Sequence, residues 1–151
     1  MNILDIAAKM AAIDEVVRKA GELDGRGRTG GVLCGADQRG VIVASMLVGE
    51  VADPERAASF KKNGEEKTTR LSANFSHVSG WMTRDFDAKK YGGSVRDNCG
   101  RVFAFSGFSE HIDEALSAAV AKIIDPKSMD PATVAMIAKV SGNPHMGAFG
   151  L

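Results

Sequence analysis

In two places of this 151-residue chain the pattern Asp-x-x-Gly lies between two short apolar segments. The first copy, residues 37–40, separates 32–36 from 41–48, and the second copy, residues 97–100, separates 94–96 from 101–106. Asp in first place and Gly in last place suit a type I turn extended by a glycine bulge. Such turns join antiparallel strands, so we predict two β-hairpins in one antiparallel sheet. Residues 41–48 are apolar on both faces, which favours a central strand.

Helical periodicity appears on both sides of these hairpins. Apolar residues recur every three or four positions in the predicted helices 2–24, 53–75, 110–124 and 130–142. In the first of them the stripe includes Ile3, Ile6, Ile13 and Val17. Gly64 interrupts the stripe of the second helix, and we expect a close approach of that helix to the sheet there. Residues 78–83 are predicted as a further strand. The expected fold class is α/β (α+β), a three-layer sandwich with an antiparallel sheet flanked by helices.

Charge, apolar runs and cysteine content argue against several classes of protein. The chain has 19 basic and 19 acidic side chains, so its formal net charge is zero, which argues against general nucleic-acid binding. No apolar run approaches the roughly 20 residues of a membrane span. The first residues lack the layout of a signal peptide, so we expect a cytoplasmic protein. The cysteines, Cys34 and Cys99, have no nearby His pair, and we predict no metal site.

Several motifs, taken together and in order, carry a family resemblance. Gly100–Gly107 is an apolar strand ending in Ser-Gly, followed after five residues by Asp113-Glu114. Gly92-Gly93 precedes this hairpin, Lys67 lies in the long helix, and 36–40 forms the first turn. This arrangement resembles the GlcG-like family, which includes the haem-binding HbpS proteins and the C-terminal domain of PduO. The resemblance covers residues 3–124, and we take 1–124 as the family-like domain.

The resemblance implies a profilin-like fold and assembly into homo-oligomers. It also implies haem as a possible cofactor, because some relatives bind haem or corrinoids. Residues 125–151 have no counterpart in the family pattern. We expect them to form a helical extension and tail that packs on the same domain or on a neighbouring subunit.

Candidate ligand-binding residues are His77, Trp81, Tyr91, Gly92 and Gly93. The His77 imidazole could ligate haem iron or act as an acid–base group, or it could bond the end of the preceding helix. Glycine N–H groups could approach a carboxylate or phosphate, or the loop could be a simple chain reversal. The two aromatic side chains could stack on a planar ligand or anchor the core or an interface.

Three functional hypotheses follow. The leading hypothesis is a small-molecule-binding protein, non-catalytic or weakly catalytic, with haem or another planar ligand. The first alternative is a small enzyme acting on an anionic metabolite, with His77 as general base and Lys67 or Arg84 as the anion partner. The second alternative is a structural protein that assembles without a ligand.

Overall fold

The computed structural model describes residues 2–151, with the exception of the side chain of Ile3. The elements in chain order are α1 (Ile3–Ala7), α2 (Met10–Asp24), β1 (Thr29–Ala36), β2 (Ile42–Glu50), α3 (Pro54–Ala73), η1 (Gly80–Thr83), β3 (Ser94–Arg96), β4 (Val102–Ser106), α4 (Glu110–Ile124), α5 (Pro131–Ser141) and η2 (Met146–Phe149). The two predicted hairpins are present, and the sheet is antiparallel throughout with the order β2-β1-β4-β3.

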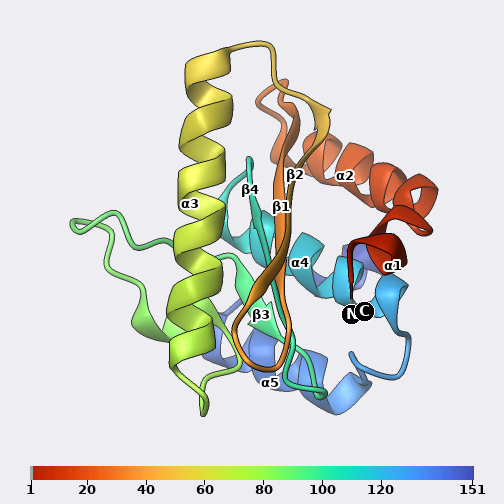
Figure 1. Cartoon of the computed structure of the whole chain (residues 1–151), viewed down its shortest axis with the longest axis vertical. Coiled ribbons are helices and arrows are strands. Elements are labelled where there is room, and N and C mark those ends of the chain that lie inside the picture. The colour runs from red at the N-terminus through yellow and green to blue at the C-terminus, as the bar shows by residue number, and fades with distance from the viewer. Residues whose placement is uncertain (1) are drawn as a thin grey trace.

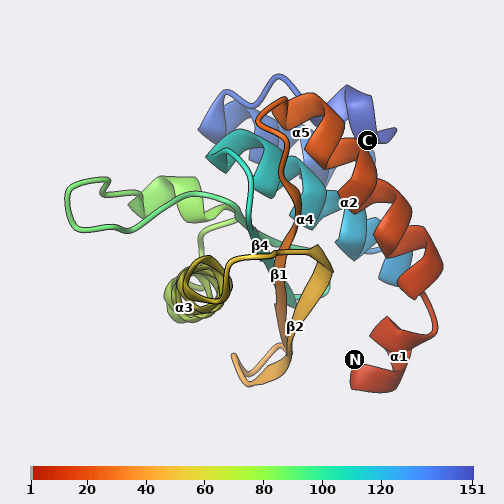
Figure 2. The same ribbon diagram turned by 90° about the horizontal axis from the view of Figure 1, so that it is seen from above.

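Helices cover both faces of the sheet, as predicted from the sequence. Figure 1 shows α3 running along one face, and Figure 2 shows α2 and α4 on the other, with α5 next to α4. The fold is therefore α+β in three layers. No helix among residues 2–151 is both long and apolar enough to cross a membrane.

Strand alternation divides the core between these two faces. Leu33, Phe103 and Phe105 belong to the large cluster under α2 and α4. Their neighbours Val32, Cys34 and Ala104 pack with Phe60 of α3 in a smaller cluster. A Cβ atom on Gly64 would lie 3.0 Å from the Cys34 sulfur, so the predicted close approach of α3 to the sheet is confirmed.

The order of the strands corrects one prediction. The segment predicted as central, residues 41–48, belongs to β2, which is an edge strand whose Leu47 side chain is 55% exposed. The central pair is β1 and β4. Gly30 and Gly31 lie near the start of β1. Their lack of side chains allows neighbouring strands to approach, because a Cβ on Gly31 would lie 2.3 Å from the Ser106 carbonyl oxygen.

Two further predictions of local structure are wrong. The first helix is divided at Ala8 and Lys9, where Lys9 has φ −110° and ψ 8°, and no glycine or proline marks this break. Residues 80–83 form a 3-10 helix rather than a strand, and only Ser79 forms a bridge to β3. Residues 78–83 resemble a strand in sequence because Val78 packs against the main core, as an apolar residue of a strand would.

The C-terminal segment packs on α4 of the same chain. Asp130 caps α5 by accepting the Thr133 N–H, and Pro131 occupies the first turn. Met146 is buried in the main cluster, and the Lys122 ammonium donates to the Gly150 carbonyl oxygen. Residues 125–151 therefore complete the core on this side of the molecule.

Candidate functional site

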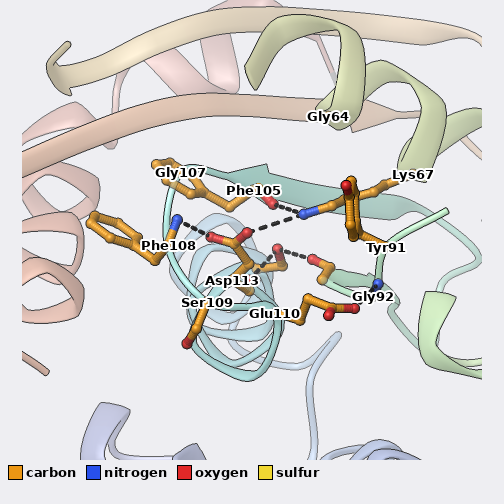
Figure 3. A network of polar contacts seen from close by, with 12 residues as sticks. Gly64, Lys67, Tyr91, Gly92, Phe105, Gly107, Phe108, Ser109, Glu110 and Asp113 are labelled. Atoms are coloured by element: carbon orange, nitrogen blue, oxygen red, sulfur yellow. Dashed lines mark hydrogen bonds and ion pairs between the residues drawn. The ribbon is translucent and has the colours of Figure 1, made fainter. Parts of the chain in front are cut away.

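A buried ion pair joins the two helical layers. Lys67 of α3 donates from Nζ to Asp113 Oδ2 of α4 at 3.0 Å and to the Phe105 carbonyl oxygen at 2.9 Å (Figure 3). Each of the two charged side chains is only 3% exposed. Lys67 lies on the sheet-facing side of α3 with Phe60, Gly64 and Leu71, which explains why its side chain enters the interior.

The Asp113 carboxyl lies at the first turn of α4. Its Oδ1 accepts the Phe108 N–H at 2.9 Å. Burial raises the pKa of Asp113 to about 6, although Lys67 and the backbone N–H groups of Phe108 and Gly107 act in the opposite direction. A carboxyl group that titrates near neutral pH can exchange a proton under physiological conditions.

Gly93 allows the chain to pass this ion pair closely. Its φ is +126°, and a Cβ atom there would lie 2.8 Å from Lys67 Nζ and 3.0 Å from Asp113 Cβ. The Gly93 carbonyl oxygen accepts the Ser117 hydroxyl at 2.7 Å. Gly93, which was predicted to bind a ligand, thus contributes to the site because a glycine leaves room for the ion pair.

The neighbouring Gly92 already binds a carboxylate, and that carboxylate belongs to the protein. Its N–H donates to Glu110 Oε2 at 2.8 Å. Arg84 donates to both oxygens of Glu110, at 2.6 and 2.8 Å. Burial would raise the pKa of Glu110, but the Arg84 guanidinium and the Gly92 N–H outweigh it and hold that pKa below its usual value. Arg84, one of the predicted anion partners, is therefore already paired with a carboxylate.

A cleft of about 380 Å³ opens above the Lys67–Asp113 pair. This volume lies near the lower end of the range of about 300–1,000 Å³ for small-molecule sites. Its walls combine aromatic and charged side chains with short polar ones. The aromatic lining residues are Phe60, Phe86, Tyr91 and Phe108, and the charged ones are Arg26, Arg28, Lys67, Glu110 and Asp113.

Arg28 is an arginine of the cleft whose N–H donors are mostly unused by the described residues. It contacts the face of Phe60, 5.7 Å from the ring centroid, and donates one hydrogen bond to the Gly107 carbonyl oxygen at 3.2 Å. Arg26, in contrast, is paired with Asp24 at 2.7 Å. Arg28 has no carboxylate within ion-pair distance among residues 2–151. Burial lowers the pKa of Arg28, and repulsion from Arg26 and Arg56 adds to this effect. The carboxylates of Asp24 and Asp113 act on this pKa in the opposite direction, and most N–H donors of Arg28 are not used by the described residues.

An extended arm, residues 84–91, projects from the body of the molecule (Figures 1 and 2). Its Phe86 and Tyr91 side chains line the cleft. The two rings meet edge to face, with centroids 5.7 Å apart. Arg70 anchors the base of the arm by donating to the carbonyl oxygens of Gly80 and Tyr91. The aromatic wall of the cleft is thus built on a hydrogen-bonded support.

The other candidate residues lie outside the cleft lining. His77 Nδ1 is buried without a hydrogen-bond partner among the described residues, and its carbonyl oxygen accepts the Arg96 Nε at 3.0 Å. Trp81 stacks on His111, with ring centroids 4.3 Å apart. Of the predicted ligand-binding side chains, only Tyr91 reaches the cleft directly.

The sequence hypotheses did not include Arg28, Phe86 or Asp113 as site residues. One signal was present for the ion pair, since Lys67 lies beside the stripe that Phe60, Gly64 and Leu71 form on its helix. The described residues 2–151 contain no cluster of three or more His, Cys, Asp or Glu side chains arranged to hold a metal. Comparisons with protein-family models, with curated proteins and with solved structures gave no match for this chain.

Proposed function

We propose that this protein binds a small anionic molecule with a flat apolar body in the cleft above Lys67 and Asp113. The observation that carries the proposal is the state of Arg28, a partly buried guanidinium at the cleft with one backbone hydrogen bond and no carboxylate partner in the described chain. A ligand carboxylate or phosphate would accept its remaining N–H donors. The Phe86 and Tyr91 rings supply the surface for the flat apolar part.

A pair of matched probes tests this proposal. Naphthalene-2-carboxylate and the neutral naphthalene-2-carboxamide share a flat body and differ in charge. In calorimetric titrations we expect the carboxylate to bind more tightly. Arg28→Gln should weaken its binding by roughly tenfold, the loss of a charged hydrogen bond. Arg39→Gln, at an arginine that is 81% exposed in a turn, is the control. Equal affinity for both probes, or equal loss in both variants, would refute the anion site.

Haem is the specific ligand that the family resemblance suggests. A haem iron needs an axial ligand, and tyrosine serves this role in some haem proteins. Tyr91 lines the cleft and His77 does not, so Tyr91 would be the better candidate to hold the iron, and Arg28 would pair with a haem carboxylate. We expect a Soret shift on titration with haemin that is lost in Tyr91→Phe and kept in His77→Ala. A Soret shift that is lost in His77→Ala and kept in Tyr91→Phe would show that His77, and not Tyr91, holds the iron.

The enzyme alternative rests on a different group from the one that the sequence suggested. Asp113 lines the cleft beside Lys67 and has a pKa near neutrality, so it is a better candidate than His77 for moving a proton. In a screen of anionic metabolites, turnover lost in Asp113→Asn and kept in His77→Ala would support it. Turnover that survives Asp113→Asn would refute this assignment.

Homo-oligomer assembly is a separate proposal. It is supported by the β2 edge, whose backbone groups are free to pair with another strand and whose Ile42 and Leu47 side chains are exposed. Leu47→Lys should then lower the mass measured by light scattering. A mass equal to that of one chain in the unsubstituted protein would refute assembly. A cytoplasmic location likewise stays a prediction.

A further inference from the structure

The cleft above Lys67 and Asp113 contains hydrogen-bonding groups that the protein itself leaves unused. Asn63 of α3 is half-buried and lines the cleft together with Phe60 and Lys67. These positions are three and four residues apart in sequence, so they lie on one side of the helix. The Asn63 carboxamide forms no hydrogen bond with any residue between 2 and 151. Its carbonyl oxygen and its amino group are therefore both available to a ligand.

Ser106 adds a buried hydroxyl to the same wall of the cleft. It is the last residue of β4 and is only 4% exposed, yet it lines the cleft and its hydroxyl forms no hydrogen bond within the described chain. Strand alternation turns it toward α3, as it does Ala104. A Cβ on Gly64 would lie 3.8 Å from the Ser106 Cβ, so this end of β4 approaches α3 next to Asn63. Buried hydroxyl groups normally have a hydrogen-bond partner, which here has to come from within the cleft.

Lys67 supplies a third group. Its ammonium has three donors, and two of them are used by Asp113 and by the Phe105 carbonyl oxygen. One N–H remains for a group in the cleft, which Lys67 lines. The polar wall, made of Asn63, Lys67 and Ser106, thus presents both hydrogen-bond donors and acceptors to the cleft.

The Phe86 and Tyr91 rings line the same cleft. Aromatic rings contact the faces of a flat molecule, whereas the groups of the polar wall bind polar atoms at its edge. A body made only of hydrocarbon would leave the polar wall without partners, which weakens binding. We infer that the ligand of the cleft is a planar heteroaromatic anion whose edge carries a lactam, a carbonyl group next to an N–H, as in oxopyrimidine and oxopurine rings. This inference rests on the proposed function and adds the chemistry of the ring to it.

Each group of the polar wall has a role in this complex. The Asn63 carboxamide pairs with the lactam through two hydrogen bonds, because its carbonyl oxygen accepts the lactam N–H and its amino group donates to the lactam oxygen. The second lone pair of that oxygen is shared by the other donors of the wall, the Ser106 hydroxyl and the remaining Lys67 N–H. The anionic group of the ligand binds Arg28, as in the proposed function.

Two probes of similar size and equal charge test the ring chemistry by calorimetry at constant pH and ionic strength. Naphthalene-2-carboxylate has a hydrocarbon body, and quinazolin-4-one-7-carboxylate has the same two-ring outline with a lactam edge. We expect the quinazolinone to bind roughly tenfold more tightly, the effect of the added hydrogen bonds. Asn63→Leu should abolish this advantage, and Ser106→Ala should reduce it. Thr69→Leu is the matched control and should preserve it, because Thr69 is an exposed neutral residue of α3 outside the cleft lining.

The outcomes separate this inference from the proposed function. If naphthalene-2-carboxylate binds and the quinazolinone shows no advantage, or shows one that survives both Asn63→Leu and Ser106→Ala, the lactam inference is wrong and the cleft proposal stands. If neither probe binds to the unsubstituted protein, both proposals fail. An equal loss of the advantage in Asn63→Leu and Thr69→Leu would indicate a general effect on α3 and would also overturn the inference.

Discussion

Lys67 Nζ and Asp113 Oδ2 lie 3.0 Å apart and connect α3 and α4, which cover opposite faces of the sheet. Because both groups are buried, removing one leaves the other as an uncompensated interior charge. We expect Lys67→Met to lower the free energy of unfolding by about 3–5 kcal/mol. Urea denaturation followed by circular dichroism measures this change.

A double-mutant cycle identifies the cause of that loss. Lys67→Met combined with Asp113→Leu removes both charges, so the combined loss should be smaller than the sum of the two single losses. Strict additivity would show that the two side chains do not interact.

Stability should also depend on pH through Asp113. Its pKa is raised from 3.8 to about 6 in the folded protein, so the folded state binds the proton more tightly than the unfolded state. The resulting stabilisation is complete below pH 4 and is lost as the pH rises through 6. At most it amounts to roughly 3 kcal/mol, at 1.36 kcal/mol for each pKa unit.

The comparison with Asp113→Asn isolates this effect from that of the other carboxyl groups. Between pH 4 and 6.5, the stability of the unsubstituted protein should fall relative to that of the variant. Glu114→Gln is a useful companion, since burial also raises the pKa of Glu114 and the sign is the same. Parallel curves for the protein and Asp113→Asn would contradict the raised pKa.

Gly93→Ala tests the packing around the ion pair. An alanine there would be strained at φ +126° and would place its Cβ 2.8 Å from Lys67 Nζ. We expect a loss of about 2 kcal/mol or more, combining strain with overpacking. Gly147→Ala is the control, because a Cβ at Gly147 has no neighbour within 4 Å. Thermal unfolding of the two variants gives the answer, and similar midpoints would disprove the close approach.

Ser141→Ala tests the buried carboxylate of Glu114. The Ser141 hydroxyl donates to Glu114 Oε1 at 2.5 Å, and Ser79 and Asn143 donate to the same side chain. Removing one donor should cost about 1–3 kcal/mol, because the carboxylate is left partly unsatisfied. Ser76→Ala, at an exposed serine, should change the unfolding free energy little. If both substitutions have the same effect, the hydrogen bond contributes nothing measurable.

The layers of the fold were predictable because local signals agreed with tertiary structure. The two Asp-x-x-Gly turns determine the hairpins, and the periodic stripes of α2, α3 and α4 face the core. Strand order was harder, because apolar residues occur on both faces of β2 although it lies at the edge. The close approach of β1 to β4 requires Gly31, which in the sequence is the last residue of a glycine-rich stretch, 25–31, typical of a linker.

The site was less predictable because it depends on contacts between distant segments. Lys67 and Asp113 are 46 positions apart, and Arg28 donates to Gly107 across 79 positions. A single sequence carries no record of such pairs. His77 and Trp81 attracted interest through their side-chain chemistry, whereas burial and partners made Arg28 and Asp113 the stronger candidates.

Glu114 makes α4 dependent on the C-terminal segment, residues 125–151. It lies on α4, yet two of its three donors come from Ser141 and Asn143, which lie in the C-terminal segment 125–151. In an evolutionary lineage, a gene that lost residues 125–151 would encode a buried carboxylate with most of its donors gone. Such a lineage would have to replace the glutamate or recruit donors from a second polypeptide. Position 114 and the C-terminal extension are therefore expected to be gained or lost together.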